Sequence, residues 1–177
     1  MENRTDVAII VGSGSDVELI NETVKTLEEF GLTYSLNIAS AHRTTKHLKQ
    51  CIEGAENLKV KVFIAAAGMS AALAGVIASS TILPVIAIPV NGKNLASLDS
   101  LFSTVQMPKG VPVATVAIGK AGAANAAILA AQIIAIGDNN LKDRLKTYKI
   151  KMAETVIKED LKLQEYGIEK YIEGLKK

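Results

Sequence analysis

The feature that most constrains the fold of this chain is a series of five short, apolar runs separated by segments long enough to form helices. Strands are predicted over Val7 to Val11, Tyr34 to Ile38, Val62 to Ala66, Val85 to Ile88 and Val113 to Ile118. Strands that are apolar throughout, rather than at alternate positions, are typical of a parallel sheet covered on both faces. Repeated βα units with right-handed crossovers therefore predict a three-layer, doubly wound α/β fold with a parallel sheet.

The segments between these runs have the length of helices and carry residues that typically begin and end them. Asp16 provides an acidic N-cap or first-turn residue, and Gly31 ends the first helix. Helices are predicted over Asp16 to Phe30, about Thr44 to Leu58, Ser70 to Ser79, and Asn94 to Val105.

Composition limits the kind of protein further. Of 177 residues, 49% are hydrophobic and only 4% aromatic, so the core must consist mainly of Ala, Val, Ile and Leu. A net charge of +2 gives no reason to expect nucleic acid or acidic membranes as partners. Cys51 is the single cysteine, which excludes an internal disulfide and favours a structural role in a reducing compartment. The start, Met1 to Asp6, lacks the pattern of a signal peptide, and no uninterrupted apolar run is long enough to span a bilayer, so we expect a cytoplasmic protein.

The last third of the chain differs from the rest. Ala121 to Ile136 carries only Asn125 and Gln132 as polar side chains, which predicts a helix buried on every side. Because a chain of this size has difficulty covering such a helix alone, we expect it at a subunit interface. Asn139 to Tyr166 is rich in Lys and Glu and predicts an amphipathic arm that packs on its own domain or on a neighbour. We expect one domain, with a core over about 6–137 and a helical arm over about 138–177.

A polar turn, Gly12 to Asp16, closes the first strand. Small residues let the backbone approach a ligand, and a helix N-terminus favours an anion. Ser13 and Ser15 add donors, and Asp16 can accept a hydrogen bond from a sugar hydroxyl. The turn is neither a Walker A loop nor a full dinucleotide fingerprint, and a capped βα turn without a ligand would have a similar sequence.

A second polar turn, Ser40 to Thr44, follows the second strand. His42 can give and take protons near neutral pH, and Arg43 can hold a phosphate or carboxylate with two parallel hydrogen bonds. The alternative to a functional site is that the hydroxyls of this turn only cap the next helix and that His42 is a solvated surface residue. His47, one helical turn later, could pair with His42 at a metal, but no carboxylate or cysteine cluster supports a metal site.

The third strand ends in a run of small residues, Ala65 to Gly75, that suits either a flat ligand or close packing of helix on sheet. With the strand order 2-1-3-4-5, the three turns line one crevice at the carboxyl end of the sheet. That convergence favours an enzyme that acts on a small phosphate-bearing molecule.

These residues, in this order, resemble the PurE family of purine biosynthesis. The resemblance runs from Val7 to the helix that begins at Ala121 and includes both polar turns. Asp99 to Pro108 is similar to the family's D-S-L-x-S-x-V-Q-M-P segment, and matching segments follow over Pro112 to Gly119 and Lys120 to Ala127.

The resemblance implies a flavodoxin-like fold, a homo-octamer joined through late helices, and a reaction that uses no metal, ATP or organic cofactor. It implies a mutase (isomerase) whose ribonucleotide substrate, N5-carboxyaminoimidazole ribonucleotide, transfers its carboxylate from N5 to ring carbon C4. The family's roles make His42 the general acid and base. The implied substrate-binding residues are Ser13, Ser15, Ser40 and Arg43 at the phosphate end, Asp16 at the ribose, and Gly68 and Leu73 in the third turn.

One segment departs from the mutase branch. Where that branch usually has A-G-G-A-A-H-L-P-G, this chain has Ala67 to Gly75 with Ala72 in place of His and Ala74 in place of Pro. The branch that carboxylates aminoimidazole ribonucleotide directly with carbon dioxide tends to have A-G-x-S-x-A-L-x-G, which this segment matches, but it carries Lys where this chain has Arg43. We therefore expect the mutase, with direct carboxylation as the alternative. A non-catalytic nucleotide-binding module is a further alternative, which would need the anion site but no titrating group at position 42.

Overall fold

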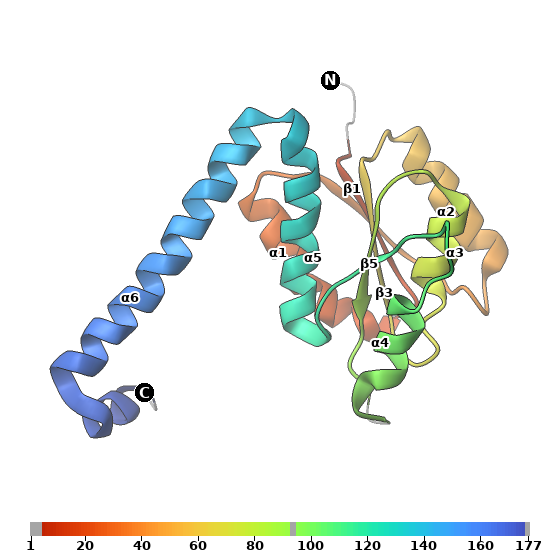
Figure 1. Ribbon diagram of the computed structural model, residues 1–177. Coiled ribbons are helices and arrows are strands. Elements are labelled where there is room, and N and C mark those ends of the chain that lie inside the picture. The colour runs from red at the N-terminus through yellow and green to blue at the C-terminus, as the bar shows by residue number, and fades with distance from the viewer. Residues whose placement is uncertain (1–4, 93–94, 176–177) are drawn as a thin grey trace.

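The computed structural model describes residues 5–92 and 95–175, so the predictions that concern residues 1–4 and Asn94 lie outside the described residues. Five parallel strands form one sheet in the predicted order β2-β1-β3-β4-β5, with helices on both faces (Figure 1). The strands are β1 (Val7–Val11), β2 (Tyr34–Ile38), β3 (Val62–Ala67), β4 (Val85–Pro89) and β5 (Ala114–Thr115). The helices are α1 (Val17–Glu29), α2 (Thr45–Asn57), α3 (Leu73–Ser80), α4 (Leu98–Val105), α5 (Gly119–Ile134) and α6 (Asn139–Leu175). Short 3-10 turns are η1 (Gly14–Asp16), η2 (Leu95–Ser97) and η3 (Ala135–Gly137).

Alternate residues of β1, β3 and β4 enter two different apolar layers. Ile9 and Ile64 belong to the layer under α1 and α5, whereas Ile10 and Phe63 belong to the layer under α2 and α3. All four side chains are at most 1% exposed. The uninterrupted apolar runs of these three strands follow from this arrangement, because a strand covered on both faces has no side for polar residues. The prediction of cover on both faces is wrong for β2, which lies at the sheet edge with Leu36 and Ile38 exposed.

Helix α5 is buried on one side only. Its alanines pack against α1, where the buried Thr23 hydroxyl donates a hydrogen bond of 2.9 Å to the carbonyl of Ala123. Contrary to expectation, one stretch of the described chain, Gly119–Gly137, is long and apolar enough to cross a membrane, yet half of it is buried inside the fold, as in a core helix. The prediction that this helix is buried on every side is not met within one chain, since Asn125 and Gln132 are exposed and Ile136 is 88% exposed.

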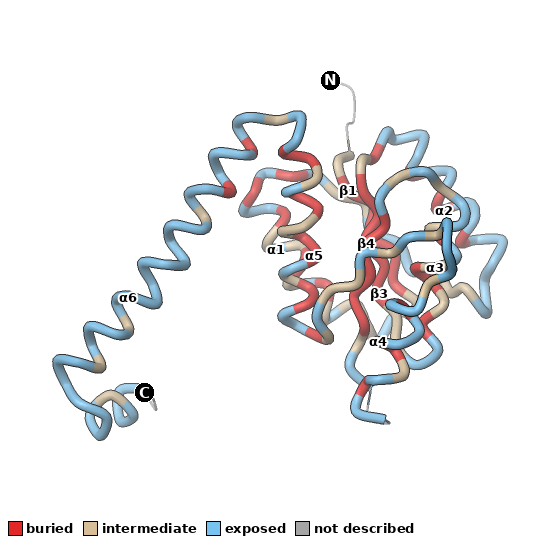
Figure 2. The backbone as a smooth tube through the Cα atoms, viewed as in Figure 1, coloured by how far each residue is buried: buried red, intermediate tan, exposed pale blue. Residues whose placement is uncertain are grey.

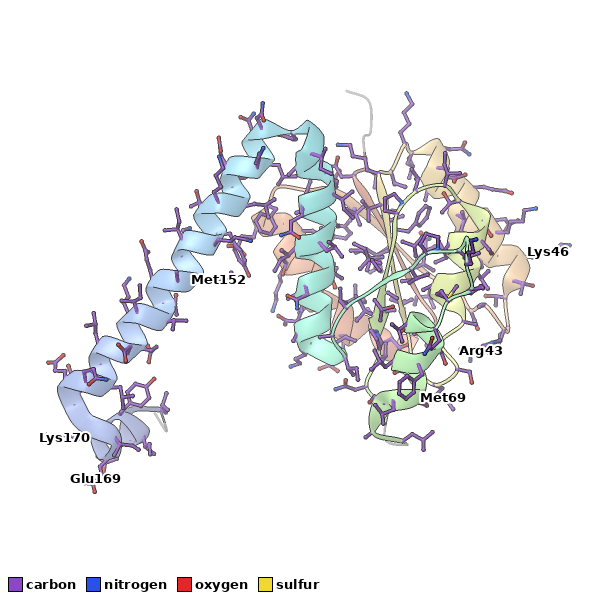
Figure 3. All side chains as sticks on the ribbon, viewed as in Figure 1. Arg43, Lys46, Met69, Met152, Glu169 and Lys170 are labelled. Atoms are coloured by element: carbon purple, nitrogen blue, oxygen red, sulfur yellow. The ribbon has the colours of Figure 1, made fainter. Side chains whose placement is uncertain are left out.

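Helix α6 leaves the domain after its first turns (Figure 2). Leu141 and Leu145 are buried, and the Tyr148 ring meets Phe30 edge-on with a centroid distance of 5.3 Å. Beyond that point the helix is largely exposed, with Met152 midway along it and Glu169 and Lys170 at the end far from the sheet (Figure 3). Packing of the whole arm on its own domain is therefore wrong. The helix runs to Leu175, within the predicted arm of about 138–177, with a kink at Gly167, where φ is +72°.

Three predicted element boundaries are corrected. The fifth strand forms ladder pairs only at Ala114 and Thr115, opposite Ile86 and Ala87 of β4, and not over the whole predicted range Val113 to Ile118. Helix α3 begins at Leu73 rather than Ser70, since the preceding residues form a loop with Met69 at φ +56°. The helix predicted before Val105 is α4 preceded by η2, in which every residue has a positive φ.

Candidate active site

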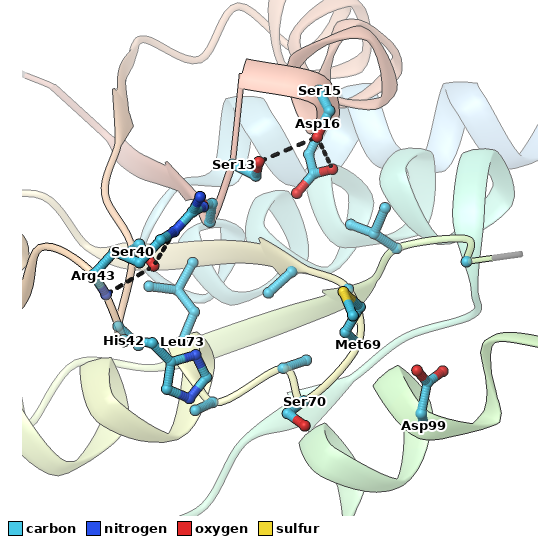
Figure 4. A pocket seen from close by; sticks show the side chains of 18 of the residues that line it. Ser13, Ser15, Asp16, Ser40, His42, Arg43, Met69, Ser70, Leu73 and Asp99 are labelled. Carbon is cyan, nitrogen blue, oxygen red and sulfur yellow. Dashed lines mark hydrogen bonds between the residues drawn. The ribbon is translucent and has the colours of Figure 1, made fainter. Parts of the chain in front are cut away.

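The loops that follow the first four strands enclose a cavity of about 650 Å³ at the carboxyl end of the sheet (Figure 4). Every residue that the sequence predicted for the site lines it: Ser13, Ser15, Asp16, Ser40, His42, Arg43, Gly68 and Leu73. The predicted convergence of three turns is confirmed, because parallel strands in this order bring their carboxyl ends to one edge.

The first wall of the cavity is the turn after β1. The Ser13 and Ser15 hydroxyls lie 3.1 Å apart, and the Ser15 hydroxyl donates a 3.0 Å hydrogen bond to Asp16 Oδ1. Asp16 stands at the N-cap position of α1 and in the first turn of η1, as predicted, but its side chain makes no capping hydrogen bond to α1. Its carboxylate instead belongs to the polar lining of the cavity.

The second wall is the turn after β2, which Ser40 organises. The Ser40 hydroxyl accepts hydrogen bonds from the backbone N–H of Arg43 at 3.2 Å and from its Nε at 3.4 Å. Arg43 Nη2 donates to the carbonyl of Gly12 at 3.2 Å, which draws the guanidinium toward the first wall. The turn itself closes through the Ser40 N–H, which donates to Thr44 Oγ1 at 2.8 Å. An arginine held in this way beside two serine hydroxyls forms a preorganised site for an anion.

The loop between β3 and α3 forms the floor and carries the unusual segment of this sequence. Met69 has a left-handed backbone, and the N–H groups of Ala71 and Ala72 bond to carbonyls two residues earlier. His42 is exposed at the cavity, on the side where Leu73 begins α3 (Figure 4). The imidazole and the anion site border the same cavity. The imidazole is therefore placed for proton transfer to a molecule that is bound through its anionic group.

Sequence reasoning missed the part of the cavity that comes from β4 and α4. Val90, Asn91 and Gly92 follow β4, and the rule that placed the other turns would have found them. Asp99 carries no such signal, because it lies ten residues beyond the strand and enters the cavity through the fold of η2 and α4.

The second histidine and the cysteine lie apart from the cavity lining. Cys51 Sγ is 3.6 Å from His47 Nε2 on α2, and burial raises the pKa of the thiol above its ordinary value. Among residues 5–92 and 95–175, no cluster of three potential metal ligands is present.

Both the sequence and the fold are similar to those of known proteins. A family model described as AIR carboxylase matches residues 6–155, which is most of the chain. This protein belongs to the AIR carboxylase family. It is a PurE-type member in structure as well. The PurE crystal structure from Treponema denticola superposes with a TM-score of 0.83 at 33% identity, covering 90% of this chain and 99% of that one.

Curated members of the family are closely similar in sequence. The Pyrococcus horikoshii protein named N5-carboxyaminoimidazole ribonucleotide mutase is 46% identical over 94% of this chain and 93% of its own length. The Thermotoga maritima protein of the same name is 45% identical over 94% of this chain and 96% of its own length. The similarity thus extends through the AIR carboxylase domain and into α6.

Proposed function

We propose that this protein is an N5-carboxyaminoimidazole ribonucleotide mutase of purine biosynthesis. The observation that carries the proposal is the meeting of Arg43, His42 and the Ser13–Asp16 turn in one cavity. The proposal is supported by relatives named for this activity, which are 45% to 46% identical over 94% of the chain.

The cavity suggests how the ribonucleotide is held. Arg43 and the hydroxyls of Ser13, Ser15 and Ser40 would bind the phosphate, and Asp16 would accept a hydrogen bond from a ribose hydroxyl. Gly68 and Leu73 would contact the base, because small residues and an apolar side chain suit a flat ring. The hydrogen bonds from Arg43 to Ser40 and Gly12 reduce the ordering cost of binding.

His42 is the proposed general acid and base. It first donates a proton to N5 of the substrate while the bond from N5 to the carboxylate breaks, which releases carbon dioxide inside the cavity. Carbon C4 of the aminoimidazole then forms a bond to that carbon dioxide, and the C4 proton passes to His42. The proton lost in the first step is regained in the second, so no metal or organic cofactor is needed. Confinement keeps carbon dioxide at a high effective concentration.

Paired histidine variants test this proposal. His42→Asn is expected to lower kcat for N5-carboxyaminoimidazole ribonucleotide by about two to four orders of magnitude, as for a lost acid–base group. His47→Asn is the matched control, because it makes the same change on an exposed part of α2 that does not line the cavity. Near-normal turnover by His42→Asn would refute the mechanism. A separate outcome, in which neither the wild type nor the variant turns the substrate over, would favour the non-catalytic nucleotide-binding module.

The second candidate is direct carboxylation of aminoimidazole ribonucleotide, which the Gly68–Leu73 segment favours through Ala72. Rates are measured with N5-carboxyaminoimidazole ribonucleotide and, separately, with aminoimidazole ribonucleotide plus bicarbonate. The mutase converts the first rapidly and the second only at very high bicarbonate. Efficient use of the second substrate alone would instead assign the carboxylase.

A homo-oligomer, with the octamer implied by the family resemblance, belongs to the same proposal, as does a cytoplasmic location. The exposed side of α5 and the exposed apolar residues of α6, among them Val156 and Ile157, support subunit contacts. Sedimentation of the purified protein measures the number of subunits.

A further inference from the structure

Asp99 is a carboxylate of the cavity wall to which neither the resemblance nor the proposed mechanism gives a role. It lies in the first turn of α4 and lines the same cavity as His42. Its Oδ1 atom is buried and accepts no hydrogen bond from any residue in the described part of the chain. A buried acceptor without a partner is costly, so a native structure that retains one calls for an explanation.

Other polar residues hold Asp99 in place. The Ser97 hydroxyl accepts a 2.9 Å hydrogen bond from the N–H of Gly92, and the buried Ser100 hydroxyl donates to the carbonyl of Val90 at 3.1 Å. These bonds tie the start of α4 to the end of β4 on both sides of Asp99. The carboxylate is therefore presented by an anchored helix turn rather than by a free loop.

The backbone that leads into this turn is strained. Leu95, Ala96 and Ser97 have φ values of 49°, 49° and 67°, and none of them is glycine. Such conformations cost free energy and occur preferentially where a site has to be preorganised. Strain beside a buried carboxylate oxygen without a partner favours a ligand-binding role for this wall.

The position of Asp99 in the cavity indicates which part of a ligand it meets. Arg43 and Ser40 lie on one side, and Asp99 lies on the opposite side beyond Met69 and Ser70 (Figure 4). A phosphate bound at Arg43 is attracted there and repelled by Asp99, so the ligand presents the end opposite its phosphate to Asp99. Because a carboxylate is an acceptor only, that end has to offer a donor.

We propose that Asp99 is a positioning residue that accepts a hydrogen bond from the exocyclic amine of the aminoimidazole ring. This inference rests on the proposed function. In the substrate, N5 carries one hydrogen and the carboxylate; after His42 protonates N5 and carbon dioxide leaves, N5 carries two hydrogens. Asp99 accepts one of these N–H groups, which fixes the plane of the amine and raises electron density at C4. Its negative charge also disfavours return of the carboxylate to N5.

Binding measurements with Asp99→Asn test the proposal by titration calorimetry. The variant is expected to bind aminoimidazole ribonucleotide about 10- to 100-fold more weakly, the range for loss of a charge-assisted hydrogen bond. Ribose 5-phosphate, which lacks the base, should bind within about twofold of wild type. Asp160→Asn on the exposed part of α6 makes the same chemical change far from the cavity and should alter neither affinity.

The outcomes separate the possible roles of Asp99. An equal loss for both ligands would place the contact at the ribose, and an unchanged affinity for both would leave Asp99 without a ligand; each result overturns the proposal. If Asp99→Asn does not fold, Asp99→Glu replaces it, since it keeps the negative charge of the first helical turn but moves the carboxylate by one methylene. The same selective loss is then expected. A wild-type protein that binds aminoimidazole ribonucleotide but does not turn over its N5-carboxylated form would refute the proposed function and leave the Asp99 test intact.

Discussion

Replacement of Gly119 by alanine is expected to destabilise the protein and to disturb the cavity. Gly119 is buried at the start of α5 and has a φ of +72°, a left-handed conformation that costs a residue with a Cβ about 1–2 kcal/mol. A Cβ at this position would also lie 2.5 Å from Asn91 Oδ1 and 2.9 Å from its Nδ2. These atoms end a flexible, exposed side chain, so the Asn91 carboxamide moves aside and the backbone strain dominates the loss of stability.

The expected magnitudes follow from these two effects. A loss of about 1–2 kcal/mol lowers the melting temperature of a domain of this size by about 2–8 °C. Displacement of Asn91, which lines the cavity, should weaken substrate binding about fivefold, equivalent to one net hydrogen bond of about 1 kcal/mol.

Gly54→Ala is the matched control. Gly54 lies within α2, its φ is outside the left-handed region, and nothing lies within 4 Å of a Cβ built there. Alanine should therefore stabilise the helix by about 0.5–1 kcal/mol and leave the substrate KM unchanged. Thermal unfolding followed by circular dichroism and the KM of both variants provide the readouts. The reasoning is refuted if Gly119→Ala raises the melting temperature as Gly54→Ala does.

Two further predictions concern titrating groups. Burial raises the pKa of Asp6, but hydrogen bonds from the Thr33 N–H and hydroxyl and the charge of Lys61 outweigh it, so the pKa lies below its ordinary value of 3.8. A depressed pKa in the folded state stabilises the protein above that pH, and the stabilisation is lost as the pH falls below it. In urea denaturation, Asp6→Asn should thus be less stable than wild type at pH 7, and the difference should shrink at pH 3; a constant difference would contradict this. Burial raises the pKa of the Cys51 thiol, so iodoacetamide should label the folded protein at least about tenfold more slowly than the urea-unfolded chain. Equal labelling rates would show that the thiol is accessible.

The site could be predicted from the sequence as far as the strand order allowed. Once the strands are placed, parallel pairing brings their carboxyl ends to one edge, and the residues that directly follow them must meet there. Ser13, His42 and Arg43 were found in this way. Asn91 follows β4 and obeys the same rule, although it was overlooked. The same rule could not place Asp99 at the cavity, because Asp99 does not directly follow a strand. Its position depends on the hydrogen bonds of Ser97 and Ser100 and on a left-handed turn that contains no glycine to indicate it.

The sequence by itself determined the central strands of the sheet, since an apolar run such as Val7–Val11 has to be buried on both faces. Val7–Val11 was predicted to the residue for this reason, and the bounds of the largely exposed edge strand Tyr34–Ile38 were also predicted correctly. The extent of β5 and the path of α6 were decided only by the tertiary structure. The strand at Ala114 pairs with β4 over two residues only, and α6 beyond Tyr148 is largely exposed, so their local patterns do not define their extent or path. Local apolar periodicity specifies what must be covered, whereas only the three-dimensional arrangement specifies what covers it.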